Sequence, residues 1–155
     1  MPAFIGEYEL SIDVKGRFLL PSGFRKQLPE SDDVQFVISR GFEQCLTLYT
    51  MDEWNLLSEK IKKLNEFNQK VRDFKRAFLS GANIVEMDGA GRLLLPKILQ
   101  EYAGITKDIV FTSQGDKMEI WDKAIHKAYM QKTMGNFSDL ATEVLGGGFM
   151  SPFEN

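Results

Sequence analysis

Short apolar runs broken by polar turns fill two separate stretches of the chain, and the two stretches match. Residues 11–28 read SIDVKGRFLLPSGFRKQL, and residues 84–99 read IVEMDGAGRLLLPKIL. In both, an apolar run is interrupted by a turn that ends in Gly-Arg, resumes for three residues and stops at a proline, which is the pattern of strand, turn and strand. The second stretch follows the first at an offset of 75 residues, so the sequence predicts an internal duplication.

The duplication continues beyond each proline. A short amphipathic segment of one or two helical turns comes first. Two apolar strands joined by a glycine-containing turn follow, at 34–39 and 45–50 in the first copy and at 108–113 and 118–122 in the second. Each copy spans roughly 40 residues, too few to bury much surface alone. We therefore expect the two copies to combine in a pseudo-symmetric β core built from interleaved hairpins.

Helical periodicity lies outside the duplicated strands. From Trp54 to Phe78, apolar residues recur at spacings of three and four, which predicts a helical segment that begins after the N-cap Thr50. Asn65 and Asn68 mark a bend or break in this segment. The opposite face carries the cations Lys60, Lys62, Lys63, Lys70, Arg72, Lys75 and Arg76. We interpret them as a solvated helix face, with a DNA contact as the alternative.

These elements indicate an α+β chain. The predicted boundaries are a first repeat at 1–50, a connecting helical segment at 51–81, a second repeat at 82–122, a C-terminal helix at 123–145 and a flexible tail at 146–155. The three consecutive glycines of the tail do not indicate a phosphate-binding loop, because no strand precedes them and no lysine follows.

Composition narrows the range of functions. With 43% hydrophobic and 26% charged residues, and without an apolar run of about 18 residues or a secretory leader, we expect a cytoplasmic protein that does not enter membranes. Cys45, the one cysteine, is expected to be a buried structural thiol. Because His126 is the one histidine, a zinc site or a Ser-His-Asp triad is disfavoured, and no metal or cofactor is expected. The net charge of −3 means that any nucleic-acid binding must come from local clusters of cations.

The duplicated turn carries the candidate chemistry. Gly16 and Gly91 are expected to supply an unusual backbone angle, and Asp13 and Asp88 to hydrogen-bond the turn backbone and orient the arginines. Turn chemistry does not call for an arginine after the glycine in both copies, at Arg17 and Arg92, whereas a guanidinium suits phosphate or the guanine edge.

An acid–base pair of the two aspartates is the enzymatic alternative. The duplication alone accounts for the recurrence of Asp13 and Asp88, and no third catalytic group is evident. The chain is therefore predicted not to be an enzyme.

The pattern Asp-x-x-Gly-Arg, three apolar residues and Pro resembles the signature of the AbrB-like swapped-hairpin DNA-binding fold. Two copies separated by a helical insertion, together with the opening FIGEYELSIDVKGRFLLP, resemble the MraZ family specifically. The resemblance covers about residues 4–145. It implies a tandem-duplicated AbrB-like swapped-hairpin (double-psi-like) β core, with helices inserted between and after the repeats.

The resemblance also implies a function. MraZ-like proteins are bacterial transcription regulators of the division and cell-wall gene cluster, including their own gene. They form homo-oligomeric rings, octameric or dodecameric, that bind direct repeats in promoter double-stranded DNA. The implied partners are thus DNA and further copies of the chain, with no small-molecule substrate and no membrane, and the implied location is the nucleoid.

In the family the loops reach the DNA. Carried onto this chain, the resemblance makes Lys15, Arg17 and Arg92 the DNA-binding residues, with Asp13, Gly16, Asp88 and Gly91 orienting the loops. The second copy departs from the first, because Gly89-Ala90 replace Val14-Lys15 and one cation is lost. We therefore expect Arg92 to contribute less than Arg17.

Two other functions remain open. One is an antitoxin-like regulator that neutralises a toxin partner, although such proteins usually carry one motif and a disordered tail, whereas here two motifs fill most of the chain. The other is a scaffolding protein that uses the duplicated core only for assembly.

Overall fold

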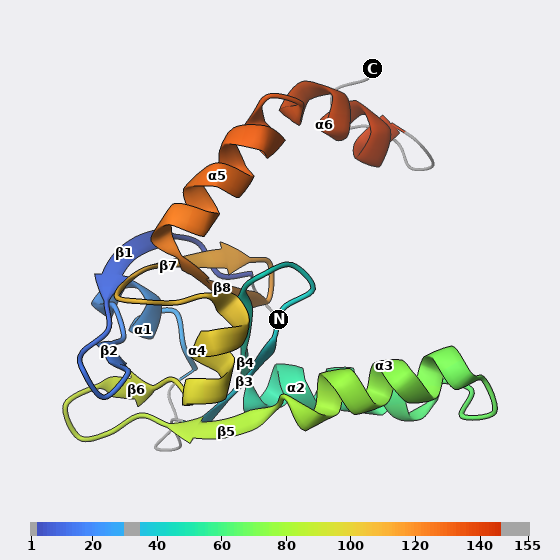
Figure 1. The fold of residues 1–155 in the computed structure, drawn as a ribbon, viewed down its shortest axis with the longest axis horizontal. Helices are drawn as coiled ribbons and strands as arrows, with labels where there is room; N and C mark the ends of the chain where they lie inside the picture. The colour runs from blue at the N-terminus through green and yellow to red at the C-terminus, as the bar shows by residue number, and fades with distance from the viewer. Residues whose placement is uncertain (1–2, 30–34, 147–155) are drawn as a thin grey trace. The chain divides into compact units, whose positions relative to one another are not determined.

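The computed structural model describes residues 3–29 and 35–146, so the tail expected at 146–155 lies outside the described residues apart from Gly146. The described residues divide into two compact units, one within 1–123 and the other within 124–155. The first copy contributes β1 (Glu7–Ser11), β2 (Arg17–Leu19), α1 (Ser22–Arg25), β3 (Gln35–Arg40) and β4 (Leu46–Thr50). The second copy contributes β5 (Asn83–Glu86), β6 (Arg92–Leu94), α4 (Lys97–Ala103), β7 (Asp108–Gln114) and β8 (Lys117–Asp122). Helices α2 (Met51–Lys62) and α3 (Gln69–Ser80) connect them (Figure 1).

Strand pairing crosses repeatedly between the two copies. Six strands form an antiparallel sheet in the order β1-β7-β8-β4-β3-β5, and β2 and β6 form a separate antiparallel ribbon. The opening strand of each copy pairs with the hairpin of the other copy, β1 with β7 and β5 with β3. The two hairpins meet where β4 pairs with β8. The chain is therefore α+β with an antiparallel sheet, as the sequence predicts, and neither copy forms its sheet alone.

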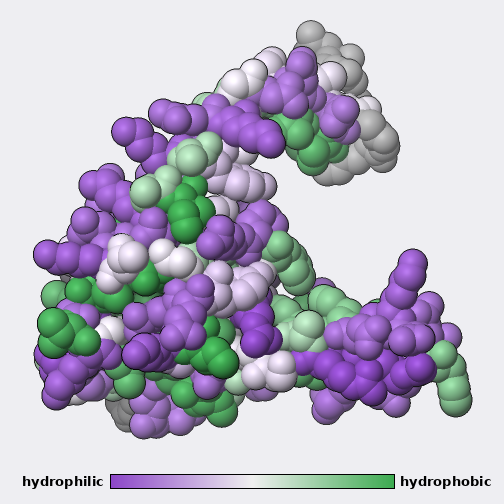
Figure 2. All heavy atoms as spheres, in the orientation of Figure 1, coloured by the Kyte–Doolittle hydropathy of each residue, from purple (hydrophilic) through white to green (hydrophobic). Residues whose placement is uncertain are grey.

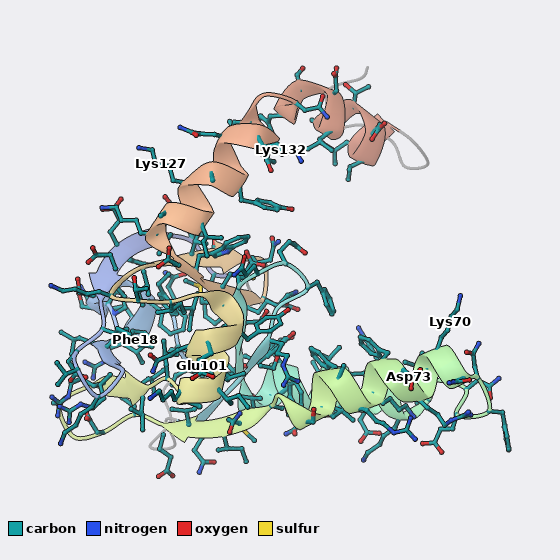
Figure 3. The ribbon with its side chains drawn as sticks, viewed as in Figure 1. Phe18, Lys70, Asp73, Glu101, Lys127 and Lys132 are labelled. Carbon is teal, nitrogen blue, oxygen red and sulfur yellow. The ribbon has the colours of Figure 1, made fainter. Side chains whose placement is uncertain are left out.

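The main core lies between the six-stranded sheet and the β2-β6 ribbon. Phe18 and Leu93, the central residues of the two ribbon strands, point into this core, and Phe18 is seen among the packed side chains in Figure 3. The ring of Phe24 from α1 meets that of Phe111 from β7 edge-on, with centroids 5.0 Å apart. Because side chains alternate along a strand, burying Phe18 and Leu93 turns their neighbours outward.

The connecting segment forms two helices rather than one continuous helix. Thr50 is the N-cap of α2, where its hydroxyl accepts a hydrogen bond from the Glu53 backbone N–H (3.3 Å), as predicted. Helix α2 ends at Lys62, and α3 begins after Asn68, whose side chain accepts from the Lys70 N–H (2.9 Å). The break thus falls where Asn65 and Asn68 interrupt the apolar pattern.

Helices α2 and α3 cover a second face of the sheet. Ile61 of α2 and Phe78 of α3 are buried against Val37 and Tyr49, which point away from the main core. The face of the helix pair that is seen in Figure 2 is mostly hydrophilic. This arrangement leaves the β2-β6 ribbon, on the opposite side of the sheet, free of the inserted helices.

Two helices also occupy the region where the sequence predicts one helix at 123–145. Helix α5 (Lys123–Met134) is followed by α6 (Phe137–Gly146). Gly135 disfavours helical continuation, and the Asn136 carbonyl accepts from the Leu140 N–H (3.0 Å) to begin the second helix. Among residues 3–29 and 35–146, no helix has the length and apolarity needed to cross a bilayer.

Candidate nucleic-acid interface

The first Gly-Arg turn is closed by its own aspartate. Oδ1 of Asp13 accepts hydrogen bonds from the backbone N–H groups of Lys15 and Arg17, both at 2.9 Å. Oδ2 accepts from Nε of Arg17 at 2.8 Å, and the Asp13 carbonyl accepts from the Gly16 N–H at 2.9 Å. One carboxylate therefore both fixes the turn and holds the guanidinium that follows it.

The second turn repeats this geometry. Oδ1 of Asp88 accepts from the backbone N–H groups of Ala90 (3.0 Å) and Arg92 (2.9 Å), and Oδ2 accepts from Nε of Arg92 (3.0 Å). Gly16 and Gly91 have φ angles of 87° and 85°, a left-handed conformation that favours glycine and that the sequence predicts. We call these two closed turns, residues 13–17 and 88–92, the clasp loops.

The β2-β6 ribbon sets the two clasp loops in a fixed relation. Arg17 pairs with Leu94 and Arg92 with Leu19, so the arginines begin their strands at opposite ends of the ribbon. The Gly16 carbonyl accepts from the Leu95 N–H (2.9 Å), and the Gly91 carbonyl accepts from the Leu20 N–H (3.0 Å). Each loop is thus hydrogen-bonded to the strand end of the other copy, and both lie on one side of the sheet (Figure 1).

The clasps shape the electrostatics of the loops. The hydrogen bond from the Arg17 backbone N–H, aided by the Arg17 side chain and the Lys15 N–H, lowers the pKa of Asp13, against a smaller opposing effect of desolvation. The Arg92 backbone N–H lowers the pKa of Asp88 in the same way. Both carboxylates are therefore ionised at neutral pH, which suits the orientation of an arginine and does not suit a general acid.

Hydrogen-bond donors on the two clasp loops remain available to an external ligand. Of the guanidinium nitrogens of Arg17 and Arg92, only Nε is bonded to a described residue. The exposed Lys15 side chain forms no ion pair or hydrogen bond within residues 3–29 and 35–146. The seven residues singled out in the sequence thus gather in two matching loops, each presenting cationic groups that an external acceptor can reach.

A further residue, Arg25, lies against the second clasp loop, and sequence reasoning missed it. A Cβ placed on Gly91 would lie 2.7 Å from Nη1 of Arg25. Arg25 belongs to α1 of the first copy, so its contact with a loop of the second copy follows from the ribbon pairing rather than from any local pattern.

The cations of the inserted helices are partly neutralised within the helix pair. Lys62 pairs with Glu59 (3.2 Å), Arg76 with Asp73 (3.2 Å) and Lys75 with Glu66 (3.0 Å). This local pairing favours the interpretation of that face as a solvated helix surface.

The described part of the chain gives little support to thiol chemistry or to a metal site. Cys45 is buried, as predicted, and burial raises the pKa of its thiol to about 12, so the thiol stays protonated and unreactive. No group of three or more His, Cys, Asp or Glu side chains gathers in a metal-binding arrangement among the described residues.

Comparison with known proteins connects the duplication to a family. The family model described as "MraZ protein, putative antitoxin-like" matches residues 3–77 and again residues 78–146. Three similar proteins are each named Transcriptional regulator MraZ. The one from Flavobacterium psychrophilum is 46% identical over 147 residues (94% of both chains), and the one from Christiangramia forsetii is 46% identical over 143 residues (92% of both). The one from Cytophaga hutchinsonii is 39% identical over 145 residues, 94% of this chain and 96% of the relative.

Proposed function

The chain belongs to the MraZ family, and from that premise we propose that it is a DNA-binding transcriptional regulator whose two clasp loops contact the duplex. The observation that carries this proposal is the repeated clasp, in which an ionised aspartate holds an arginine through Nε and leaves the other two guanidinium nitrogens without a partner among the described residues. Two such groups on one ribbon are difficult to explain by turn stability alone.

The chemistry of the loops suits base and phosphate recognition. A guanidinium held in one orientation loses little conformational entropy when it donates two hydrogen bonds to O6 and N7 of guanine. We assign this role to Arg17 and Arg92, and contact with the phosphate backbone to Lys15, whose flexible ammonium is less selective. In this proposal Asp13, Asp88, Gly16 and Gly91 position the loops without touching bases.

We further propose that residues 1–50 and 82–122 are two AbrB-like repeats in a swapped-hairpin arrangement, joined by the helical segment at 51–81. The exchange of β1 and β5 between the copies supports this, since each opening strand completes the hairpin sheet of the other repeat.

The assembly and target are proposed from the family resemblance. We propose a ring of eight or twelve copies, associated with the nucleoid, that binds direct repeats in the promoter of the division and cell-wall gene cluster. A ring reconciles the net charge of −3 with DNA binding, because several subunits that each bring a few cations act together at high effective concentration. Neighbours in a ring are related head to tail, which matches direct repeats better than a palindrome.

An antitoxin-like role is the second candidate, favoured by the wording of the family description. It differs in its partner, since an antitoxin forms a stoichiometric complex with a toxin protein.

Native mass spectrometry separates these functions. The chain is measured alone and with a duplex taken from the DNA upstream of its own coding sequence. A ring that gains the mass of the duplex supports the proposal. A dimer that binds DNA supports the antitoxin-like alternative, and a ring that does not bind the duplex overturns DNA binding in favour of a scaffold.

A further inference from the structure

The two clasp loops differ at one position in their cationic residues. Lys15 lies between the aspartate and the glycine of the first loop, and Ala90 stands at the same place in the second. Asp88 and Arg92 alone would leave the second loop without net charge, whereas Asp13, Lys15 and Arg17 give the first loop one net positive charge. On this count the second loop is the weaker ligand for a polyanion.

Arg25 restores the missing charge from the other copy. It is the last residue of α1, and its guanidinium lies over Gly91, with Nη1 and Cζ at 2.7 Å and 3.4 Å from the position of a Cβ on that glycine. The second loop together with Arg25 therefore carries one net positive charge, the same as the first loop.

The first loop has a matching neighbour that is neutral. Gln100 of α4 stands 75 positions after Arg25, the same offset as between the two loops. Its amide nitrogen lies over Gly16, where a Cβ would collide with it, and it donates to the Leu95 carbonyl at 2.8 Å. Each loop is thus covered by a long side chain from the other copy, a glutamine where the loop has Lys15 and an arginine where the loop has Ala90.

The guanidinium of Arg25 is available to an outside acceptor. Arg25 is exposed, and its side chain forms no hydrogen bond or ion pair with any residue in 3–29 or 35–146, although its backbone N–H and carbonyl are bonded within the α1 turn. Arg40, in the same unit, is by contrast an arginine whose guanidinium is engaged within the protein. Its Nη1 donates to the Ala77 carbonyl at 2.6 Å, and its guanidinium lies over the ring of Tyr102.

We propose that Arg25 is a DNA-contacting residue of the second clasp loop, where it binds the phosphate backbone as Lys15 does at the first. The two loops of one subunit then bind DNA as electrostatic equals, each with one base-reading arginine and one phosphate-binding cation. This inference rests on the proposed function and removes the reason to expect less from Arg92 than from Arg17.

The test compares single and compensating variants on one DNA probe. Wild type, Arg25→Gln, Lys15→Gln, Arg25→Gln/Ala90→Lys and the control Lys70→Gln are titrated by fluorescence anisotropy with a duplex from the chain's own upstream DNA at four salt concentrations. Lys70 is an exposed cation on α3 whose side chain points away from the helix pair (Figure 3). Thermal unfolding of each variant reports whether the fold is intact.

We expect Arg25→Gln and Lys15→Gln to reduce the salt dependence of DNA binding equally, and Ala90→Lys to restore it. Arg25→Gln and Lys15→Gln should each flatten the slope of log affinity against log salt by about 0.9 per engaged subunit, the value for one phosphate contact. Ala90→Lys should restore the slope in the Arg25→Gln background, because it places a cation where the first loop has Lys15. Lys70→Gln should keep the wild-type slope.

Two outcomes overturn the inference alone, and a third overturns it together with the proposed function. If Lys15→Gln flattens the slope and Arg25→Gln does not, Arg25 makes no phosphate contact, while the proposed function stands. If Arg25→Gln weakens binding but Ala90→Lys does not restore it, Arg25 acts through packing on Gly91. If the wild-type chain does not bind the duplex, or Lys15→Gln leaves the slope unchanged, the proposed function of the loops fails and this inference fails with it.

Discussion

At the scale of single residues, one carboxylate in each clasp loop has two structural roles. Oδ1 of Asp13 or Asp88 closes the turn through backbone N–H groups, and Oδ2 holds the arginine. The arginine side chain is half-buried and joined to the loop at one nitrogen, so its removal leaves the turn closed by Oδ1. Binding and folding are therefore separable at these positions.

Arg17→Ala should remove specific DNA binding and leave the fold intact. Each lost guanine contact should cost about 1–3 kcal/mol, summed over the engaged subunits, whereas surface substitutions usually change stability little. A gel-shift titration with specific and scrambled duplexes measures the first effect, and circular dichroism measures the second. Unchanged affinity for the specific duplex would contradict the assignment of Arg17 to base recognition.

Gly16→Ala should destabilise the protein, with Gly89→Ala as its matched control. Gly16 has a φ of 87°, and a Cβ there would lie 3.2 Å from the Leu95 carbonyl oxygen and would collide with Gln100. A left-handed angle alone costs a non-glycine residue about 1–2 kcal/mol. A Cβ on Gly89 meets no atom within 4 Å. Urea unfolding should show a loss of at least this size for Gly16→Ala only, and equal stability of the two variants would refute the strain argument.

The pKa of Asp13 gives a test by pH. Because hydrogen bonds from Arg17 lower the folded-state pKa, the clasp contributes stability above the unfolded-state pKa of about 3.9, and this contribution is lost as the pH falls through the lower folded value. The carboxyl carbon of Asp13, followed by NMR, should titrate below about 3.9 in the folded protein. In Arg17→Ala the titration should shift upward. An Asp13 pKa above 3.9 in the wild type would mean that the clasp does not persist in solution.

At the scale of elements, the inserted helices and the ribbon are held by different clusters. Phe78 of α3 stacks on Phe74 (centroids 5.5 Å apart) and also meets Trp54 and Phe42, at 5.7 Å and 5.9 Å. None of these rings belongs to the core cluster that supports the β2-β6 ribbon. The helix pair can therefore be weakened without direct disturbance of the clasp loops.

Phe78→Ala should cost about 3–5 kcal/mol of unfolding free energy, because it empties a buried aromatic site. Phe67→Ala is the control, since Phe67 is 96% exposed in the connection between α2 and α3 and its removal should change stability by no more than about 0.5 kcal/mol. Chemical denaturation measures both. A loss for Phe78→Ala as small as that for Phe67→Ala would show that α3 does not pack on the sheet as described.

Much of the fold was predictable from the sequence because the same local sequence pattern occurs in both copies. The strands, the left-handed glycines, the N-cap Thr50 and the buried Cys45 each follow from local patterns. The contact of Arg25 with Gly91 did not follow, because it depends on which strand pairs with which across the copies. The one sequence signal for this contact is a compensating pair of differences between the copies. The first copy has Lys15 where the second has Ala90, and the first copy has Arg25 where the second has Gln100.

At the scale of the whole molecule, the proposed DNA binding depends on many modest contacts acting together. A chain with a net charge of −3 cannot attract DNA by its overall field, so in the proposed function the affinity comes from loops that several subunits present along one duplex. The steepness of the salt dependence and its growth with the number of DNA repeats report how many loops are engaged at once.

The most direct measurement is therefore a fluorescence-anisotropy titration at four salt concentrations on DNA with one, two and three promoter repeats. Each neutralised phosphate contributes about 0.9 to the slope of log affinity against log salt. Multivalent binding by several subunits predicts a slope of roughly −4 to −8 on DNA with several repeats, and lower affinity with a flatter slope on a single repeat, where one subunit engages. A slope of about −1 that does not change with repeat number would contradict it, because the duplicated clasp loops would then not act as a multivalent DNA-binding array.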